Sequence, residues 1–412
     1  MIFEPETVKG FRDYLPPESA KRNKIKEIVR KCYKLYGFLP VETPMIELDE
    51  LMRSNTLEEE DEAVSERFRL KDKGRRNLGL RYEFTFQLGR IFKKNPNIKL
   101  PFRKYQIGEN FRDEPIRTGR TRQFTMCDAD IIGDSSPAAD AECISLVTDI
   151  LKELKIKNFE IQINNRKILD EIIRSVRIKE TKKVMRELDK IEKIGEDNVK
   201  INLKKYADSG QIITLFRLLG KDLNFFKENL FEGSEELDEL IKLCKLYGVK
   251  IKFNPFMIRG FNYYTGSIFE FMVGKTAIAA GGRYDNLVGR YIERKIPAVG
   301  ISFSLESLMS LCEKELSELK TDYNPRTLIL SLSQDKEAIK LAKTFRKSNI
   351  SCVSMFGKPG KSLEFANSQK IPYVIFIGSK EIEKKKFKLK EMSTGKEKLM
   401  NEKQLVTKLS KK

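Results

Sequence analysis

The sequence predicts an α+β fold in more than one domain, and three observations support this prediction. The chain has 412 residues, which is more than one small hydrophobic core accommodates. Two segments with the alternation of antiparallel strands flank a basic loop, and strand texture returns after a helical stretch in the middle of the chain. Towards the C-terminus, strands alternate with helices, which is typical of a small α/β domain with a mostly parallel sheet.

The first part of the chain, residues 1–166, is expected to combine helices with antiparallel strands. Residues 17–38 carry apolar side chains at helical spacing, and Gly37 stands where a helix would end. The segment "RFRLKDKGRRNLGLRYEFT" is typical of two strands joined by a Lys-Gly turn, and "FTFQLGRIF" is typical of a helix. "KYQIGENFRDE" and "RTRQFTMCDADIIG" alternate like paired antiparallel strands around the basic loop "PIRTGR". Residues 137–156 have the pattern of an amphipathic helix.

The rest of the chain divides into three further parts. Residues 167–248 are rich in lysine and glutamate and have few strand signals, which indicates an inserted helical module. Strand-and-turn texture returns in residues 249–318. The segment "ELSELKTDYNPR" is typical of a linker, and residues 326–412 contain the alternating strands and helices of the α/β domain.

The composition narrows the class of protein. An excess of 79 Lys and Arg over 60 Asp and Glu gives a formal net charge of +19. Solvated lysine-rich faces and a polyanionic partner such as nucleic acid both explain this charge, which by itself does not decide between them. No apolar run is long enough to span a membrane, and the N-terminus is charged, unlike a secretory signal. Six scattered cysteines without a C-x-x-C pair predict reduced thiols in a cytoplasmic protein and no metal site.

The sequence contains no histidine. Catalytic triads with a histidine base, histidine metal sites and imidazole acid–base catalysis are therefore excluded within this chain. Any catalysis has to use arginine, lysine, carboxylates, hydroxyls, a metal held by oxygen, or groups of the substrate itself.

The first group of candidate functional residues is "FRDE" with "RTGRTRQF" after it. Arg112 and Glu114 are two residues apart on an expected strand, so both face the same side. From these two residues alone, an ordinary cross-strand ion pair is the favoured interpretation. The arginines of the following loop (Arg117, Arg120 and Arg122) strengthen a functional interpretation, because polyphosphate is the usual reason to gather arginines beside a strand end.

Three more segments are candidates, and each is weak evidence when taken alone. In "MIRGFNYYTGSIFEF", Arg259 precedes a glycine, and Tyr263 and Tyr264 are expected to send their rings to opposite faces of a strand. In "AAGGRYDNLV", two glycines permit a close approach of the backbone to a ligand and precede Tyr284. "PAVGISFSLESL" leads a strand into a helix, as a phosphate site would, but it ends without a cation.

Together these segments, in this order, resemble the histidyl-tRNA synthetases, a family of class II aminoacyl-tRNA synthetases. "KGFRDYLPPE" is similar to the opening of the family, "YGFLPVETPMIE" to its motif 1, which forms a dimer interface, and "LRYEFT" to its amino-acid-binding strand. "FRDEPIRTGRTRQF" resembles motif 2, "IRGFNYYTG" and "GGRYDNLV" the two histidine-specific motifs, and "PAVGISFSLESL" motif 3. The resemblance implies an antiparallel catalytic sheet flanked by helices, a helical insertion and a C-terminal α/β anticodon-binding domain.

The resemblance also implies the reaction and its partners. L-histidine and ATP, with Mg²⁺, form histidyl-adenylate, and the histidyl group then moves to the 3′ end of histidine tRNA. The enzyme is expected to be a cytoplasmic homodimer. Because the substrate carboxylate attacks the α-phosphate, no protein nucleophile or base is needed, and catalysis comes from positioning and from cations that stabilise charge at phosphorus.

Carried over residue by residue, the resemblance assigns roles within three sets. The expected catalytic residues are Arg112 and Arg259. The expected ATP-binding residues are Arg112, Glu114, Arg120, Arg122 and Ser307. The expected amino-acid-binding residues are Glu83, Phe84, Thr85, Met126, Asp130, Tyr263, Tyr264 and Tyr284. Of these, Glu83, Thr85 and Asp130 would receive the substrate ammonium group, and the tyrosines would line the side-chain pocket.

Several positions depart from the family pattern. Motif 3 usually ends in an arginine that grips ATP phosphates, and Ser307 stands at the matching position. Ser304 replaces a usual glycine, Met126 a usual glutamine and Asn262 a usual aspartate. The loss of one charge-assisted phosphate contact costs about 1.5–3 kcal/mol. One hypothesis is that a nearby loop supplies the charge through Arg290, Arg294 or Lys295.

These departures keep two alternatives open. One is a catalytically weakened paralogue that serves as a regulatory or binding subunit, for instance in histidine biosynthesis. Arg259 and the C-terminal domain, which resembles an anticodon-binding domain, argue against it, because a regulator that never meets tRNA has no use for such a domain. The other is a class II synthetase for a different amino acid, which would have to explain both histidine-type motifs.

Overall fold

The computed structural model describes residues 4–52, 66–258, 263–292, 294–321 and 323–410. The chain divides into two compact units, Met1–Lys320 and Thr321–Lys412. Each unit is described by itself below. In the described part of the chain, no helix is long and apolar enough to cross a membrane.

The first unit is built on a sheet whose strand order is β1-β5-β6-β11-β10-β9-β7-β8. The bounds of the strands are β1 Leu39–Pro40, β5 Phe102–Phe111, β6 Gln123–Ile132, β7 Glu160–Asn165, β8 Lys252–Phe253, β9 Ser267–Val273, β10 Thr276–Arg283 and β11 Ala298–Ser304. The central pairs are antiparallel, and the two edge pairs, β1 with β5 and β7 with β8, are parallel. The predicted antiparallel sheet is therefore confirmed, and β5 pairs with β6 as the alternation indicated.

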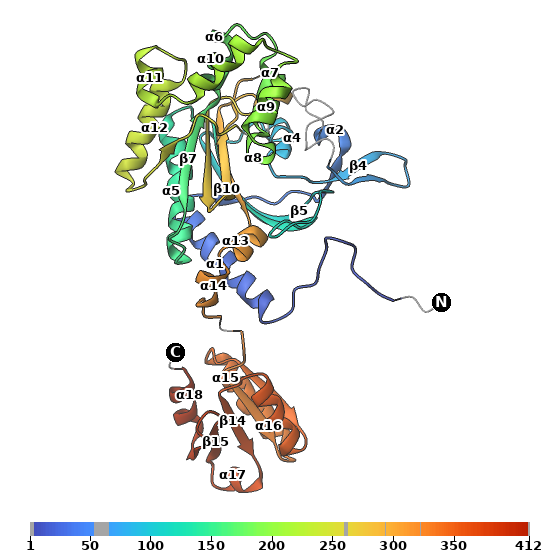
Figure 1. Cartoon of the computed structure of the whole chain (residues 1–412). Coiled ribbons are helices and arrows are strands. Elements are labelled where there is room, and N and C mark those ends of the chain that lie inside the picture. Colours follow the sequence, from blue (N-terminus) through green and yellow to red (C-terminus); the bar gives the residue numbers. More distant parts are fainter. Residues whose placement is uncertain (1–3, 53–65, 259–262, 293, 322, 411–412) are drawn as a thin grey trace. The chain divides into compact units, whose positions relative to one another are not determined.

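Helices cover one face of this sheet (Figure 1). Helix α1 (Glu18–Leu35) and helix α5 (Pro137–Glu153) bury apolar residues such as Val29 and Ile144 against alternate residues of β6, among them Cys127 and Ala129. Burial of each such side chain contributes about 1.5–3 kcal/mol, so this layer is the main source of stability for the unit. Helices α13 (Leu305–Leu311) and α14 (Glu313–Ser317) extend the layer after β11.

The helical insertion predicted for residues 167–248 consists of helices in the structure. They are α6 (Arg166–Ser175), α7 (Thr181–Leu188), α8 (Ile191–Ile194), α9 (Glu196–Leu203), α10 (Ser209–Leu219), α11 (Leu223–Glu228) and α12 (Ser234–Leu246). Their buried residues, for example Ile172, Leu215 and Leu240, belong to the same apolar cluster as α5 and the sheet. The insertion therefore forms one compact unit with the sheet, and its exact limits stay a prediction.

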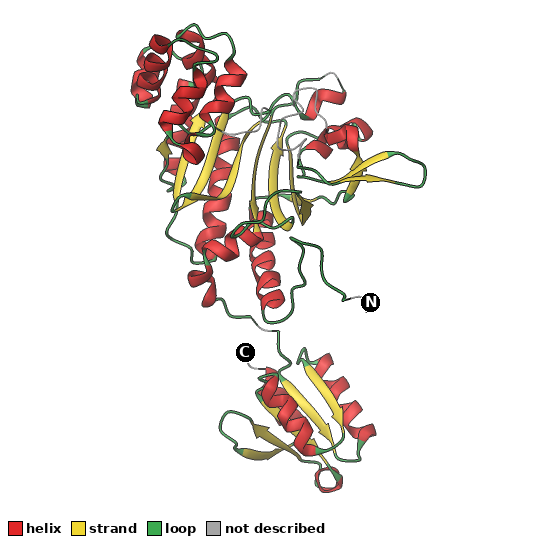
Figure 2. Ribbon diagram, turned by 45° about the vertical axis from the view of Figure 1, so that its right-hand side comes forward, coloured by secondary structure: helices red, strands yellow, loops and turns green. Residues whose placement is uncertain are grey.

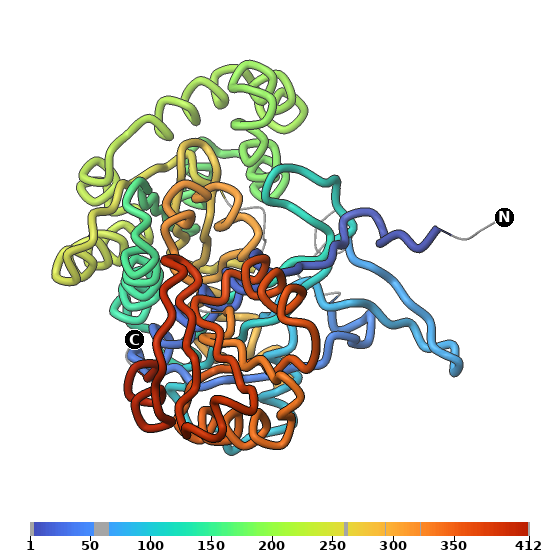
Figure 3. The backbone as a smooth tube through the Cα atoms, turned by 90° about the horizontal axis from the view of Figure 1, so that it is seen from below, coloured from blue at the N-terminus to red at the C-terminus, as the bar shows by residue number. Residues whose placement is uncertain are grey.

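A small sheet of β2 (Ile46–Leu48), β4 (Asn77–Leu80) and β3 (Arg69–Lys71) accompanies the large one. Strands β3 and β4 form the predicted antiparallel hairpin, which projects from the first unit as the light-blue tube in Figure 3. Helix α2 (Asp49–Met52) and helix α4 (Phe86–Lys94) lie nearby, and η1 (Val288–Tyr291) packs on α4. There, Gly89 makes room for the ring of Tyr291.

The C-terminal unit is a sheet with the order β13-β12-β14-β15-β16 between helices (Figure 2). Its strands are β12 (Thr327–Ser331), β13 (Cys352–Phe356), β14 (Tyr373–Ile377), β15 (Phe387–Glu391) and β16 (Glu397–Met400). Its helices are α15 (Asp335–Lys347), α16 (Pro359–Ser368), α17 (Ser379–Glu383) and α18 (Glu402–Ser410). The alternating residues of β12 serve two cores, with Ile329 facing α15 and α18 and Leu328 facing α16. The first three strands are parallel as predicted, whereas β15 and β16 add an antiparallel edge.

One buried ion pair ties α1 to the end of the sheet. Arg22 of α1 donates to Glu306 of α13 at 2.6 Å, and both side chains are almost fully buried. The second oxygen of Glu306 accepts the backbone N–H of Thr125 at 2.9 Å and the hydroxyl of Ser304 at 3.1 Å. Glu306 therefore joins the helix layer, β6 and the end of β11 at one point.

We expect Arg22→Met to lower the free energy of unfolding of the first unit by about 3–5 kcal/mol, because it leaves the Glu306 carboxylate buried without its cation. Lys31→Met is the matched control: Lys31 lies on the same helix and also contacts a carboxylate, that of Glu153, at 2.6 Å, but this pair is exposed to solvent. Chemical unfolding at one protein concentration should show little change for the control. Equal losses for the two variants would contradict this role of Glu306.

Candidate active site

A cavity opens on the side of the large sheet opposite α1 and α5. Its lining comes from β6, β10, β11, the segment before α4, the loop between β5 and β6, and the residues before β9. Strand β6 explains how one segment serves both faces, because successive side chains of a strand point to opposite sides. Phe124, Met126, Asp128 and Asp130 line the cavity, whereas the residues between them enter the core or its polar edge.

The structure brings most of the sequence-predicted site residues together in this cavity. Lining it are Glu83, Thr85, Arg112, Glu114, Arg120, Met126, Asp130, Tyr263, Tyr264, Tyr284 and Ser307. Arg259 and Asn262 lie outside the described residues. These side chains come from segments that are far apart in the sequence, so their convergence supports a common function.

Two of the predicted residues lie elsewhere. Phe84 is buried beneath the cavity, where its ring packs with Phe124 and Met126. Arg122 turns away from the cavity: it forms an ion pair with Asp113 at 3.1 Å, and its aliphatic part lies over Gly10. Their roles in binding stay predictions. In the structure, Phe84 packs beneath residues that line the cavity, and Arg122 is held by its ion pair with Asp113.

The loop hypothesis for the motif 3 position is not supported by the geometry. Arg290, Arg294 and Lys295 do not line the cavity. The guanidinium of Arg290 lies 4.9 Å from the centre of the Tyr291 ring and belongs to a separate cavity beside Glu47. The reason is that η1 packs on α4, which holds this loop away from the end of β11.

Arg112 and Glu83 form the polar wall of the cavity. The Arg112 guanidinium lies between two rings, 4.2 Å from the centre of Tyr82 and 5.1 Å from that of Phe124, which fixes its plane through cation–π contacts. Glu83 accepts a hydrogen bond from the Tyr263 hydroxyl at 3.1 Å. Burial raises the pKa of Glu83 to about 7, although Arg112 and the hydroxyl of Tyr263 act in the opposite direction.

Aromatic rings enclose the next part of the cavity. The ring of Tyr263 lies 4.8 Å from that of Tyr264 and 5.9 Å from that of Tyr284, between ring centres. Both Tyr263 and Tyr264 line the cavity, so the expectation that their rings point to opposite faces of a strand is wrong. The reason is local: these residues precede β9 in a turn, where the period of two does not apply.

The floor contains two charged residues that sequence reasoning missed. Lys104 of β5 lies 2.5 Å from a carboxylate oxygen of Asp128 and 2.5 Å from one of Asp130, and all three side chains are buried. The Tyr284 hydroxyl donates to the other oxygen of Asp130. A sequence signal for Asp128 did exist, since it lies midway between Met126 and Asp130 on the same face of one strand.

Gly300 is required by this arrangement. A side chain at position 300 would place its Cβ only 1.9 Å from a carboxylate oxygen of Asp130. The glycine of "PAVGISF" therefore lets the Asp130 carboxylate lie directly against the backbone of β11.

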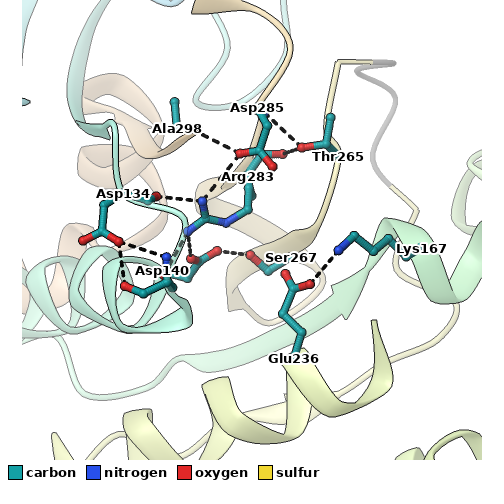
Figure 4. Close-up of polar contacts among 10 residues, drawn as sticks. Asp134, Asp140, Lys167, Glu236, Thr265, Ser267, Arg283, Asp285 and Ala298 are labelled. Atoms are coloured by element: carbon teal, nitrogen blue, oxygen red, sulfur yellow. Dashed lines mark hydrogen bonds and ion pairs between the residues drawn. The ribbon is translucent and has the colours of Figure 1, made fainter. Parts of the chain in front are cut away.

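A buried network fixes Tyr284 by holding both of its neighbours (Figure 4). The Arg283 guanidinium donates to the carbonyl oxygens of Asp134 at 2.8 Å and Ser136 at 3.0 Å and pairs with the carboxylate of Asp140. Asp285 accepts from the backbone N–H of Ala298 at 3.2 Å. In the segment "GGRYDNLV", Arg283 and Asp285 therefore hold Tyr284 in a fixed position beside the site.

Ser307 contacts the basic loop. Its hydroxyl donates to the backbone carbonyl of Gly119 at 2.8 Å, and a Cβ added to Gly119 would lie 3.1 Å from the Cα of Ser307. Gly119 has a φ of +72°, which favours glycine at this turn. The serine therefore holds the loop that carries Arg120, and a long side chain at position 307 would displace it.

We expect the pH dependence of stability to reveal Glu83. An acid whose pKa rises on folding from 4.5 to about 7 keeps its proton longer in the folded state, so it lowers stability as the pH rises through this window. Relative to Glu83→Gln, the wild type should lose roughly 3 kcal/mol between pH 4.5 and pH 7 and nothing more above it. The free energy of unfolding of both proteins should be measured across this range. Parallel profiles of stability against pH for the wild type and Glu83→Gln would contradict a raised pKa of Glu83.

Comparisons with known proteins agree with this geometry. The family model for histidyl-tRNA synthetase matches residues 10–308, and that for an anticodon binding domain matches residues 327–412. The chain is 36% identical to histidine--tRNA ligase 1 of Bacillus cereus, covering 96% of this chain and 94% of the relative. It is 34% identical to histidine--tRNA ligase of Clostridium tetani, covering 97% of each.

Solved structures give the same result. The crystal structure of histidyl-tRNA synthetase from Nostoc sp. PCC 7120 superposes with a TM-score of 0.83, at 27% identity and with 99% of each chain covered. The match extends over most of the chain, and most of the predicted site residues lie in one cavity. The chain belongs to the histidyl-tRNA synthetase family.

Proposed function

We propose that this chain is a histidine–tRNA ligase that activates L-histidine with ATP and transfers the histidyl group to the 3′ end of histidine tRNA. The observation that carries this proposal is the one cavity in which Arg112 of motif 2, Tyr264 of the first histidine-type motif and Ser307 of motif 3 meet. The alternative of a regulatory paralogue is not favoured, because the relatives named histidine--tRNA ligase match nearly the whole chain, and an anticodon binding domain is part of the match.

The first chemical step requires no protein base. An oxygen of the substrate carboxylate, already ionised, attacks the α-phosphorus of ATP, the new P–O bond forms, and the bond to diphosphate breaks. In the second step a hydroxyl of the terminal ribose of the tRNA attacks the acyl carbon, and AMP leaves. The chain contributes orientation and positive charge, which is consistent with a sequence without histidine.

We assign the residues of the polar wall to this first step. Arg112, held in plane by Tyr82 and Phe124, would contact the α-phosphate, and Arg259 would approach it from the other side on the basis of the sequence. Glu83, once ionised, would accept the substrate ammonium group. Mg²⁺ would arrive with ATP and be held mainly by phosphate oxygens, which leaves one or two carboxylates to be supplied by the protein. Glu114, which lines the cavity beside the basic loop, is a candidate.

Arg120 is the candidate to replace the missing arginine of motif 3. Together with Arg112 it supplies the cations among the described residues that line the cavity. Its guanidinium lies 3.4 Å from Glu114, and more than half of its side chain is exposed, so it is able to turn toward a polyphosphate. Ser307, through its hydrogen bond to Gly119, would position this arginine rather than contact ATP itself.

A homodimer and a cytoplasmic location are also proposed. The segment resembling motif 1 exposes Leu39, Met45 and Ile46, three apolar residues on or beside short strands. Such a patch at a sheet edge suits a second copy of the same segment. Transfer of histidine to tRNA belongs in the compartment of protein synthesis, and the described cysteines are free thiols.

The direct test is histidine-dependent exchange between ATP and diphosphate, followed by charging of a histidine tRNA transcript. The wild type should show both activities. Arg259→Ala should lower the exchange rate at least about a hundredfold, because it removes a cation at the reacting phosphate, while tRNA binding stays unchanged. Histidine binding without any exchange at saturating ATP would favour the regulator, and near-normal exchange by the variant would remove Arg259 from its assigned role.

Arg120→Ala should raise the KM for ATP by about tenfold and leave the KM for histidine unchanged, because it removes one charge-assisted phosphate contact. Arg117→Ala is the matched control: Arg117 lies on the same loop and pairs with Arg120 through the backbone but does not line the cavity. Initial exchange rates at varied ATP measure both. If the two variants behave alike, the loop acts through its overall charge and Arg120 has no special role.

A further inference from the structure

The floor of the cavity combines two carboxylates with one ammonium group. In the β5–β6 ladder Lys104 is directly opposite Asp130, and Asp128 is the diagonal neighbour, so the three side chains share one face. Their exposed fractions are 1% for Lys104, 4% for Asp128 and 1% for Asp130. Burial of three charges is expensive, so two carboxylates on the wall of a cavity with a buried ammonium group behind them point to a purpose beyond stability.

The two carboxylates and the lysine are placed differently with respect to the cavity. Asp128 and Asp130 line it, whereas Lys104 lies behind them and contacts both. The carboxylates raise the pKa of Lys104 in spite of its burial, so the ammonium is kept. Burial and the neighbouring Asp130 raise the pKa of Asp128, and Lys104 opposes this shift. By their geometry, the two carboxyl groups face the ligand, and the ammonium group of Lys104 lies on the far side.

The surroundings define the kind of side chain that this floor accepts. The rings of Tyr263, Tyr264 and Tyr284 enclose the space above it, which suits a flat ring. Asp130 already receives the Tyr284 hydroxyl, so a ligand ring with two N–H groups needs a second acceptor, and Asp128 is in place to provide it. A ring with fewer donors leaves one acceptor site of the floor without an N–H, which is a strong basis for rejection because the site is buried.

We propose that Asp128 is a specificity-determining residue that accepts an N–H of the substrate imidazole, and that Lys104 is a positioning residue that holds Asp128 and Asp130 together as one acceptor floor. This inference rests on the proposed activation of histidine and adds two residues to its amino-acid pocket. Asp128 and Asp130 together select the form of the imidazole ring that carries two N–H groups. Lys104 acts through the carboxylates and does not touch the substrate.

The test compares histidine with 1,2,4-triazol-3-ylalanine, whose neutral ring carries one N–H group. Asp128→Asn should raise the KM for histidine about ten- to a hundredfold, leave the KM for ATP unchanged, and reduce the preference for histidine over the triazole analogue. Lys104→Met should show the same loss of preference, and Lys104→Arg should recover part of it. Exchange assays give these constants, and thermal unfolding reports whether each variant is folded.

Arg103→Met is the matched control. Arg103 precedes Lys104 on β5, points to the opposite face of the strand and pairs with Glu142 at 2.7 Å, away from the cavity. It should leave both KM values and the preference unchanged. A folded Asp128→Asn variant with a wild-type KM for histidine and a wild-type preference for histidine over the analogue would overturn the inference. If the wild type itself shows no exchange, the proposed function fails instead, and calorimetric titration of histidine and the analogue into wild type and Asp128→Asn decides the role of Asp128 separately.

Discussion

Strand β6 lies between β5 and β11. The rest of the first unit depends on the alternation of its side chains between the two faces of the sheet. One set of its side chains, including Cys127 and Ala129, meets the apolar faces of α1 and α5. The other set, including Met126 and Asp130, lines the cavity. A shift of register by one residue would put carboxylates into the core and apolar groups into the site. The hydrophobic layer therefore fixes the register, and the register places the functional groups.

Several buried charges in the described part of the chain are met by a specific partner. Glu306 has Arg22, Arg283 has Asp140, and the two aspartates of the floor have Lys104. Such pairs contribute little net stability, because desolvation offsets most of the attraction, but losing one partner is expensive. They therefore act as constraints on geometry. Each of them joins elements that are distant in the sequence.

The departure at Ser307 has a structural consequence. Ser307 binds the backbone of Gly119 in place of a long cation, and Arg120 on the same loop lines the cavity. We propose that the positive charge expected at the end of motif 3 comes from motif 2 instead. The function of the site then depends on the position of a loop and less on the helix that follows β11.

By itself the sequence determined the fold class and the order of the elements, because strand and helix periodicity are local properties. Most of the cavity lining followed from the resemblance of its motifs to those of the histidyl-tRNA synthetases. This resemblance identified Arg112, Glu83 and Tyr284 correctly as residues that meet in one place. Their roles remain proposals. The antiparallel edge of β15 and β16 was missed, since short strands rich in charge carry a weak signal.

Only the tertiary structure decided what depends on contacts between distant segments. It placed Phe84 and Arg122 behind the cavity, kept Arg290 away from it and turned Tyr263 and Tyr264 toward the same side. It also revealed the floor of Lys104, Asp128 and Asp130, in which the lysine comes from β5 and the two aspartates from β6, 24 residues away or more. Sequence patterns report which face a residue takes within its own element, whereas a shared site depends on how those elements pack.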